Sequence, residues 1–147
     1  MKKIFVFFIS LFFIFQNSLY SYSSNPKDFV HELVNDAISK LADKNLNNDQ
    51  KADFIEKLAL ENVDINALSL YTLGELRKSS KKDDIINYKK SFESYFLKSL
   101  TSRLKDYSSS KFEILGEDKK SANYTIINSK VTPTDGGPEI KIDWRIY

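Results

Sequence analysis

The chain has 147 residues, a formal net charge of +2 and no cysteine. The lack of cysteine excludes disulfide bonds, thiolate zinc sites and cysteine nucleophiles. Lys2 and Lys3 alone account for the net charge, so the rest of the chain is neutral, which argues against nucleic acid or an anionic membrane surface as the main partner.

Residues 1–23 have the features of a secretory signal peptide. Two lysines precede an apolar run interrupted only by Ser10, and the small residues Ser21 and Ser23 fit the two recognition positions of a signal-peptidase site. A run of about 12 apolar residues is shorter than the roughly 20 that span a bilayer, although an uncleaved membrane anchor is the alternative. We therefore expect an exported protein in which residues 24–147 form one domain.

Two helices are predicted in the first part of this domain. Asn25 is a suitable capping side chain, and Pro26 follows it at the first helical position. A polar run over residues 45–50 ends this helix and offers a cap for the second. The apolar positions at helical spacing are Phe29, Val30, Leu33, Ala37, Ile38 and Leu41 in the first helix and Phe54, Ile55, Leu58 and Ala59 in the second.

Two further helices follow, separated by a glycine. Asp64 caps the third helix, and Gly74 marks its end or a kink. Asp83 or Asp84 starts the fourth, which is the longest. The apolar faces are expected to comprise Ile65, Leu68 and Tyr71 in the third helix and Ile85, Tyr88, Phe92, Tyr95, Phe96, Leu100 and Leu104 in the fourth.

Beyond these helices the periodicity becomes that of strands. Residues 111–115 and 123–131 are predicted strands, residues 135–138 form a turn, and residues 139–147 alternate between apolar and charged side chains. This order predicts an α+β domain, with N-terminal helices packed on one face of a curved, mostly antiparallel sheet. Periodicity alone leaves open whether helices and sheet enclose a solid core or a cavity.

Several short motifs occur in an order that is typical of one family of exported proteins. They are Val63-Asp64, Leu73-Gly74, Arg77, Phe92, Tyr95, Leu104, Tyr107 and Asp143-Trp144-Arg145. In their order and intervals, the chain resembles the MlaC, or toluene-tolerance, family of periplasmic phospholipid-binding proteins. Members of that family usually continue past the Asp-Trp-Arg strand with further strands and a helix, so the resemblance implies a domain shortened at its C-terminus.

The resemblance implies a periplasmic carrier with a phospholipid as cargo and no cofactor. The acyl chains would lie in a cavity between helices and sheet, as in nuclear-transport-factor-like folds. Because each buried methylene contributes about 0.8 kcal/mol, release into water would be very slow, and the carrier must exchange lipid by docking to partners. The implied partners are an inner-membrane ABC transporter with an MCE-domain ring and an outer-membrane lipoprotein–porin complex, which together maintain outer-membrane lipid asymmetry.

Ten residues are candidates for lipid contact. Arg77 and Arg145 are expected near the phosphate at the mouth of the cavity, because a guanidinium matches phosphate geometry; a solvated or ion-paired role is the alternative. Eight inward-facing apolar residues are expected to line the tail cavity, with ordinary core packing as the alternative: Leu68, Leu73, Phe92, Phe96, Leu100, Ile126, Ile142 and Trp144.

Two other functions stay open, a small exported interaction domain with a solid core and a hydrolase that uses carboxylates. His31 is the single histidine and has no partner motif, while Asp83-Asp84 and Glu117-Asp118 are better explained as caps and turns. The sequence contains no HExxH, GxSxG, P-loop or dinucleotide-binding motif. We therefore expect neither an enzyme nor a metal site.

Overall fold

The computed structural model describes residues 21–104 and 107–147, and most of the predicted signal peptide lies outside the described residues. Helices come first along this part of the chain and strands afterwards, as predicted. The elements are α1 (Pro26–Ala42), α2 (Asn48–Asn62), α3 (Ile65–Leu73), α4 (Leu76–Ser79), α5 (Lys82–Leu104), β1 (Ser110–Ser121), β2 (Tyr124–Pro133) and β3 (Ile140–Ile146).

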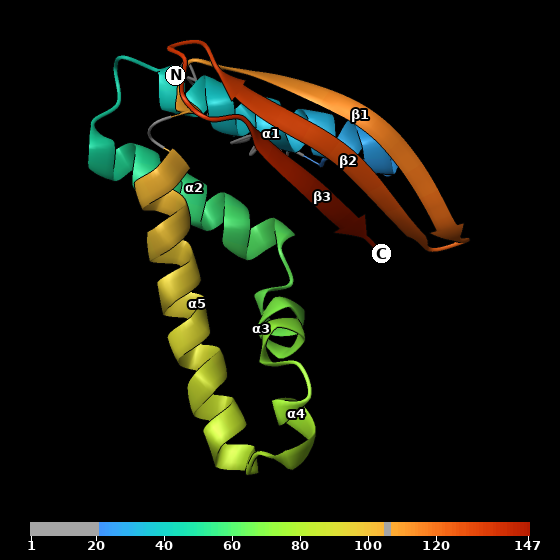
Figure 1. The fold of residues 1–147 in the computed structure, drawn as a ribbon. Coiled ribbons are helices and arrows are strands. Elements are labelled where there is room, and N and C mark those ends of the chain that lie inside the picture. The colour runs from blue at the N-terminus through green and yellow to red at the C-terminus, as the bar shows by residue number, and fades with distance from the viewer. Residues whose placement is uncertain (1–20, 105–106) are drawn as a thin grey trace, which may run out of the picture.

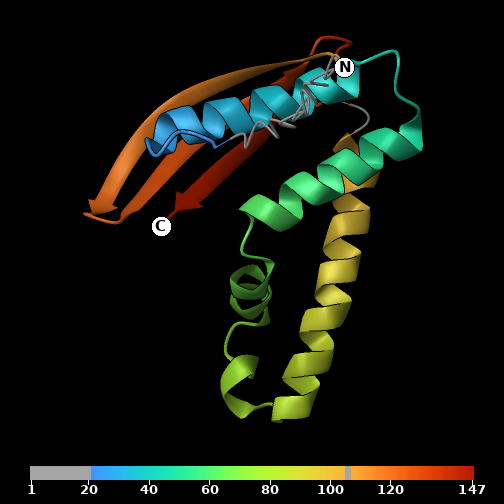
Figure 2. The ribbon, with the colours of Figure 1, turned by 180° about the vertical axis from the view of Figure 1, so that it is seen from behind.

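The described strands form one antiparallel sheet in the order β1-β2-β3. The strands curve around α1, which lies along the concave face and contacts β1 and β2 (Figures 1 and 2). The predicted α+β fold, with N-terminal helices and a curved antiparallel sheet, is therefore confirmed, and α1 is the helix that lies along the sheet. We call α1 and the three strands the sheet layer.

Helices α2 to α5 extend away from this layer, and we call them the helical arm. Within the arm, α5 packs against both α2 and α3, and α2 also contacts α1. Figures 1 and 2 show α3, α4 and the first half of α5 projecting beyond the sheet. Contact between the helices and the sheet is therefore made chiefly by α1.

The predicted caps of the first three helices are present, whereas Asp83 and Asp84, predicted to start the fourth, lie inside the first turn of α5. The Asn25 side chain accepts hydrogen bonds from the backbone N–H groups at the start of α1. At α2, Asn47 and Gln50 form a capping box, with reciprocal bonds of 2.9 and 3.0 Å. Asp64 accepts from the third backbone N–H of α3 at 2.9 Å, and Gly74 ends that helix with a φ of 59°.

One further helical turn is present, and one predicted turn is regular structure instead. Residues 76–79 form the single helical turn α4. Glu117 and Asp118, predicted as a turn, lie within β1. The pairing of β1 with β2 shifts in register between Ile114 and Gly116 and then continues, and the residues of β1 beyond Gly116 are all exposed.

Two predicted buried tyrosines are exposed. Tyr71 is 63% exposed and Tyr95 is 74% exposed. On α5, the buried arc runs from Phe92 and Phe96 to Leu97, and Tyr95 lies beyond its edge. Among the described residues of α5, Leu97 alone is buried, although the predicted apolar face omitted it.

Six of the buried apolar residues form two clusters, and buried Leu33, Leu41, Ile55 and Val131 lie outside them. Cluster 1, in the sheet layer, consists of Val30, Val34 and Ile127, with partly buried Phe29, Ile38, Phe112, Ile114, Trp144 and Ile146 around them. Cluster 2, in the helical arm, consists of Ala59, Ile65 and Leu97, with partly buried Val63, Phe92, Phe96 and Leu100. The domain therefore has two packing centres rather than one.

The residues that precede α1 pack against it. The Tyr22 hydroxyl donates to Asp36 Oδ2 at 3.0 Å, and its ring meets Phe29 edge-on with centroids 5.7 Å apart. Burial, followed by the bond to Asp36, raises the pKa of Tyr22 to about 12. Cleavage after Ser23 would remove this contact from the domain.

Candidate functional site

Five of the eight predicted tail-contact residues lie on α3 and α5 of the helical arm. All five are partly buried, and three of them pack around cluster 2. They are Leu68 and Leu73 on α3 and Phe92, Phe96 and Leu100 on α5. The arm therefore brings most of the predicted apolar contacts into one region.

The aromatic side chains of α5 form a ladder at intervals of four residues. Phe92 and Phe96 stack with centroids 6.1 Å apart and planes 10° apart, and Tyr88 lies 6.0 Å from Phe92. The Tyr88 and Thr72 hydroxyl oxygens are 3.0 Å apart, which joins α5 to α3. The result is a partly buried aromatic surface fixed at one end by a polar contact between the two helices.

The three predicted contacts from the sheet do not join this region. Trp144 packs on cluster 1, its indole N–H donates to Ser129 Oγ at 2.8 Å, and the Ser129 hydroxyl donates to the Ile142 carbonyl at 3.2 Å. Ile142 and Trp144 pair with residues of β2 that face α1. These two side chains therefore contribute to the sheet layer.

Ile126 lies on the other face of the sheet. It pairs with Arg145, whereas its neighbour Ile127 pairs with Trp144 and faces α1. Because side chains alternate along a strand, Ile126 and Trp144 point in opposite directions. The structure therefore does not bring Ile126 together with the other predicted apolar contacts.

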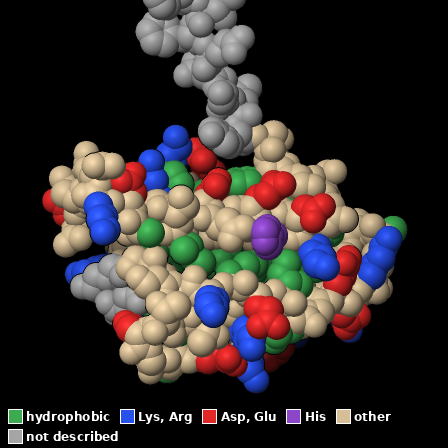
Figure 3. Space-filling view, turned by 90° about the horizontal axis from the view of Figure 1, so that it is seen from above, with side chains coloured by type: hydrophobic (Ala, Val, Ile, Leu, Met, Phe, Trp, Pro, Cys, Tyr) green, Lys and Arg blue, Asp and Glu red, His purple; other side chains and the backbone are tan. Residues whose placement is uncertain are grey.

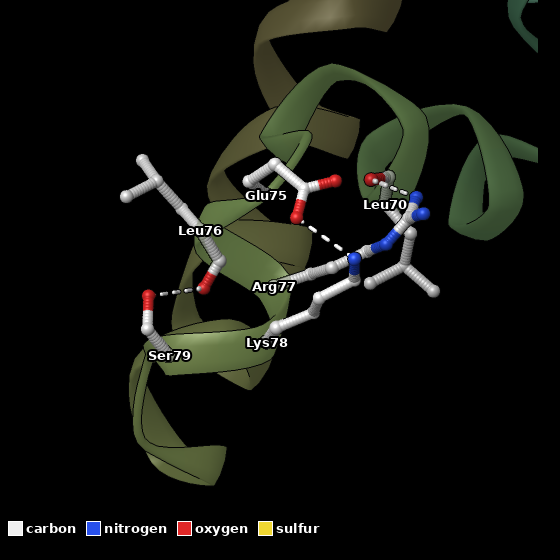
Figure 4. Close-up of polar contacts among 6 residues, drawn as sticks. All are labelled: Leu70, Glu75, Leu76, Arg77, Lys78 and Ser79. Carbon is white, nitrogen blue, oxygen red and sulfur yellow. Dashed lines mark hydrogen bonds and ion pairs between the residues drawn. The ribbon is translucent and has the colours of Figure 1, made fainter.

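The two predicted headgroup arginines have different surroundings. Arg77 lies on α4, where its Nη1 donates to the Leu70 carbonyl at 3.4 Å beside the Lys78–Glu75 ion pair (Figure 4). Arg145 lies on β3, with its guanidinium 5.2 Å from the centroid of the Tyr71 ring. The two arginines therefore lie in different regions, Arg77 in the helical arm and Arg145 in the sheet layer.

Arg145 has two further tyrosine neighbours that the sequence analysis did not identify. Its Nη1 donates to the Tyr124 hydroxyl at 3.4 Å, and the Tyr124 ring stacks on Tyr147 at 4.5 Å with planes 2° apart. The phenol groups of Tyr124 and then Tyr71 raise the pKa of Arg145. Only the pairing of β2 with β3 brings these side chains together, so the sequence offered no local signal for them.

The single histidine is a surface residue. His31 is exposed on α1, its ring lies 6.3 Å from that of Phe112, and the Asn35 side chain is within 3.1 Å of Nδ1. Figure 3 shows it beside a row of hydrophobic side chains. Within residues 21–104 and 107–147, no group of three or more His, Cys, Asp or Glu side chains is arranged to hold a metal ion.

A shallow hollow lies on an exposed side of α2. It has a volume of about 410 Å³, and none of the predicted lipid contacts lines it. Its lining residues are Asp53, Glu56, Lys57, Leu60 and Glu61. Four of these five are charged, so the hollow does not suit an acyl chain.

Comparison with known proteins identifies one family. The family model described as MlaC protein matches residues 31–147, which cover α1 from its second turn, the whole arm and all three strands. No curated protein matches the sequence. Among the helices that the structure describes, none is both long and apolar enough to cross a membrane.

Proposed function

We propose that this chain, which belongs to the MlaC family of periplasmic phospholipid-binding proteins, carries phospholipid between an inner-membrane ABC transporter with an MCE-domain ring and an outer-membrane lipoprotein–porin complex. The observation that carries the proposal is the family match over residues 31–147. The family is one of lipid carriers rather than enzymes, so the proposal includes no catalytic residue. It includes export through a cleaved signal peptide and a role in outer-membrane lipid asymmetry.

The helical arm is the part of the chain that we assign to the acyl chains. Five partly buried apolar residues lie on α3 and α5 of the arm, and three of them pack around cluster 2. Large aliphatic and aromatic surfaces suit a hydrocarbon tail, which gains about 0.8 kcal/mol for each methylene removed from water. The residues that we propose as tail contacts are Leu68, Leu73, Phe92, Phe96 and Leu100.

We assign Ile142, Trp144 and Arg77 to roles other than tail contact. Ile142 and Trp144 face α1, where packing and the bonds through Ser129 account for their positions. Arg77 donates to the carbonyl of Leu70, which is 7 residues earlier in the chain. This local hydrogen bond explains the position of the Arg77 side chain without a lipid headgroup. Tail contact is therefore proposed for the arm alone.

Native mass spectrometry of the protein isolated from the periplasm tests this proposal, together with organic extraction of its cargo. We expect one phospholipid per chain. Phe92→Glu and Leu100→Glu should each abolish co-purification of the lipid, because a carboxylate beside a hydrocarbon tail loses its hydration. Tyr95→Glu is the matched control, since Tyr95 lies on the same helix with 74% of its surface exposed and should retain the lipid.

The alternative function gives a different result in the same experiment. A folded and monodisperse protein that carries no lipid, even after incubation with phospholipid vesicles, would contradict the carrier function. It would favour a small exported interaction domain with a solid core.

A further inference from the structure

Arg145 is held by tyrosines from three separate elements. The Tyr71 ring comes from α3, Tyr124 is the first residue of β2, and Tyr147 follows β3. The guanidinium lies 5.2 Å from the Tyr71 centroid and donates to the Tyr124 hydroxyl, while the stacked Tyr147 ring supports Tyr124. We call these four residues the Arg145 cluster.

The positive charge of this cluster has no carboxylate partner in the described part of the chain. Arg145 forms none of the ion pairs found there. Asp143, two positions earlier on the same face of β3, instead accepts from Asn128 Nδ2 at 2.7 Å. A guanidinium has five N–H donors, and its contacts with the Tyr124 and Tyr147 side chains use only some of them. The remaining donors are available to an anion.

The position of the cluster relates it to the helical arm. Tyr71 lies on α3 between Leu68 and Leu73, two of the residues proposed to contact acyl chains. Figures 1 and 2 show the C-terminal end of β3, where Arg145 lies, on the side of the sheet nearer to α3. Because its guanidinium contacts Tyr71, an anionic group bound at Arg145 would lie near α3, the helix that carries Leu68 and Leu73.

We propose that the Arg145 cluster is a phosphate-binding site, in which the guanidinium binds phosphate oxygens and the phenol hydroxyls donate further hydrogen bonds. Arginine binds phosphate through paired N–H groups, and the aromatic ring of Tyr71 orients the guanidinium plane. The phosphate belongs either to a phospholipid headgroup or to free inorganic phosphate. The headgroup source rests on the proposed carrier function, whereas the free phosphate source does not.

The headgroup source is tested by measuring binding of two short-chain lipids with identical acyl chains, a phosphatidylcholine and a diacylglycerol. Only the phosphatidylcholine has a phosphate, so a preference of the protein for this lipid measures the contribution of the headgroup. We expect the phosphatidylcholine to bind with about tenfold higher affinity, which is the effect of one charge-assisted hydrogen bond. Arg145→Gln should remove the preference, and Tyr124→Phe should reduce it. Lys141→Gln, which removes an exposed positive charge from the same face of β3, should leave it unchanged.

The free phosphate source is tested by titrating inorganic phosphate into the lipid-free protein while the Arg145 Nε–H signal is followed by NMR. A saturable shift that Tyr124→Phe weakens, without a preference between the two lipids, supports free phosphate as the ligand. A preference that Arg145→Gln removes supports the lipid headgroup. If Arg145→Gln does not fold, Tyr124→Phe provides the same comparison, because it removes only a hydroxyl.

Two results separate this proposal from the carrier function. If neither lipid binds but phosphate still shifts the Arg145 signal, the carrier function is contradicted and the phosphate site stands. If both lipids bind equally and phosphate causes no shift, the phosphate site is overturned and the carrier function stands. The absence of any response to lipids and phosphate overturns both.

Discussion

The sheet layer and the helical arm pack their apolar side chains in different ways. In the sheet layer, Val30 and Ile127 are 0% exposed, and buried Ser129 bonds to Trp144 and Ile142. In the arm, Ile55 is 2% exposed, while the rings of Phe92 and Phe96 are partly buried and stack along α5. Both regions therefore combine buried and partly buried apolar side chains, but bonds between strands fix Trp144 in the sheet layer, whereas the stacked rings of α5 offer apolar surface that a ligand could cover.

This difference assigns separate tasks to the two regions. Completely buried side chains and bonded polar groups, as in the sheet layer, stabilise the fold and are sensitive to loss of volume. A partly covered apolar surface contributes less to stability and more to binding. Substitutions in the sheet layer should therefore change the free energy of unfolding, and those in the arm should change lipid binding.

The largest expected effect on stability is that of Ile127→Ala. Ile127 is completely buried, so we expect a loss of about 3 kcal/mol in the free energy of unfolding, as is usual for truncation of a buried isoleucine. Phe96→Ala in the arm should lose clearly less, since its ring is only partly buried. Urea denaturation measures both. Equal losses would show that the arm is packed as tightly as the sheet layer.

A smaller loss is expected from Gly74→Ala at the end of α3. Gly74 has φ 59° and ψ −133°, a conformation that disfavours residues with a Cβ atom, so the substitution should cost roughly 1–3 kcal/mol. Gly116→Ala is the matched control, because its φ is not positive and its Cβ would meet Asn128 at an ordinary 3.6 Å. Hydrogen exchange should show faster opening of α3 while β2 stays protected.

The bond between Trp144 and Ser129 should contribute about 1 kcal/mol to the sheet layer. A double-mutant cycle with Trp144→Phe and Ser129→Ala isolates it, because the coupling term excludes the packing lost in each single variant. We expect a coupling energy near this value from chemical denaturation. A coupling energy of zero would show that packing alone positions the indole.

The smallest expected effect is a pH dependence at the edge of the sheet layer. The pKa of Tyr22 rises from 10.0 to about 12 on folding, so its contribution is complete below pH 10.0 and is lost as pH rises through about 12. In a chain that retains residue 22, the native protein should be more stable than Tyr22→Phe near neutral pH. The difference in free energy of unfolding between the two proteins should decrease as the pH rises from 10.0 to about 12. A constant difference would mean that Tyr22 titrates normally.

Local sequence signals predicted most of the fold. Asn25, Asn47 and Asp64 begin the first three helices because a short polar side chain satisfies the free N–H groups of the first turn. The alternation of residues 139–147 predicted a face of β3 that does turn toward α1. Such features depend on neighbours in sequence, which a single chain displays directly.

The site was less predictable because it depends on pairing between distant segments. Ile126 and Ile127 are adjacent and chemically alike, and only the register of β2 with β3 decides which of them faces α1. The Arg145 cluster similarly joins residues 71, 124, 145 and 147 through the approach of α3 to the sheet. Helical periodicity also placed Tyr95 on the buried arc and omitted Leu97, since the centre of that arc is set by α2 and α3.

The position of Trp144 has a consequence for spectroscopy. It is the single tryptophan of the chain, and it belongs to cluster 1 with its indole N–H on Ser129. Its fluorescence emission therefore reports the environment of the sheet layer, whereas most of the far-ultraviolet circular dichroism signal comes from helices, chiefly those of the arm. If the two signals change at different denaturant concentrations, the two regions unfold separately, and this chain carries the probe that distinguishes them without any added label.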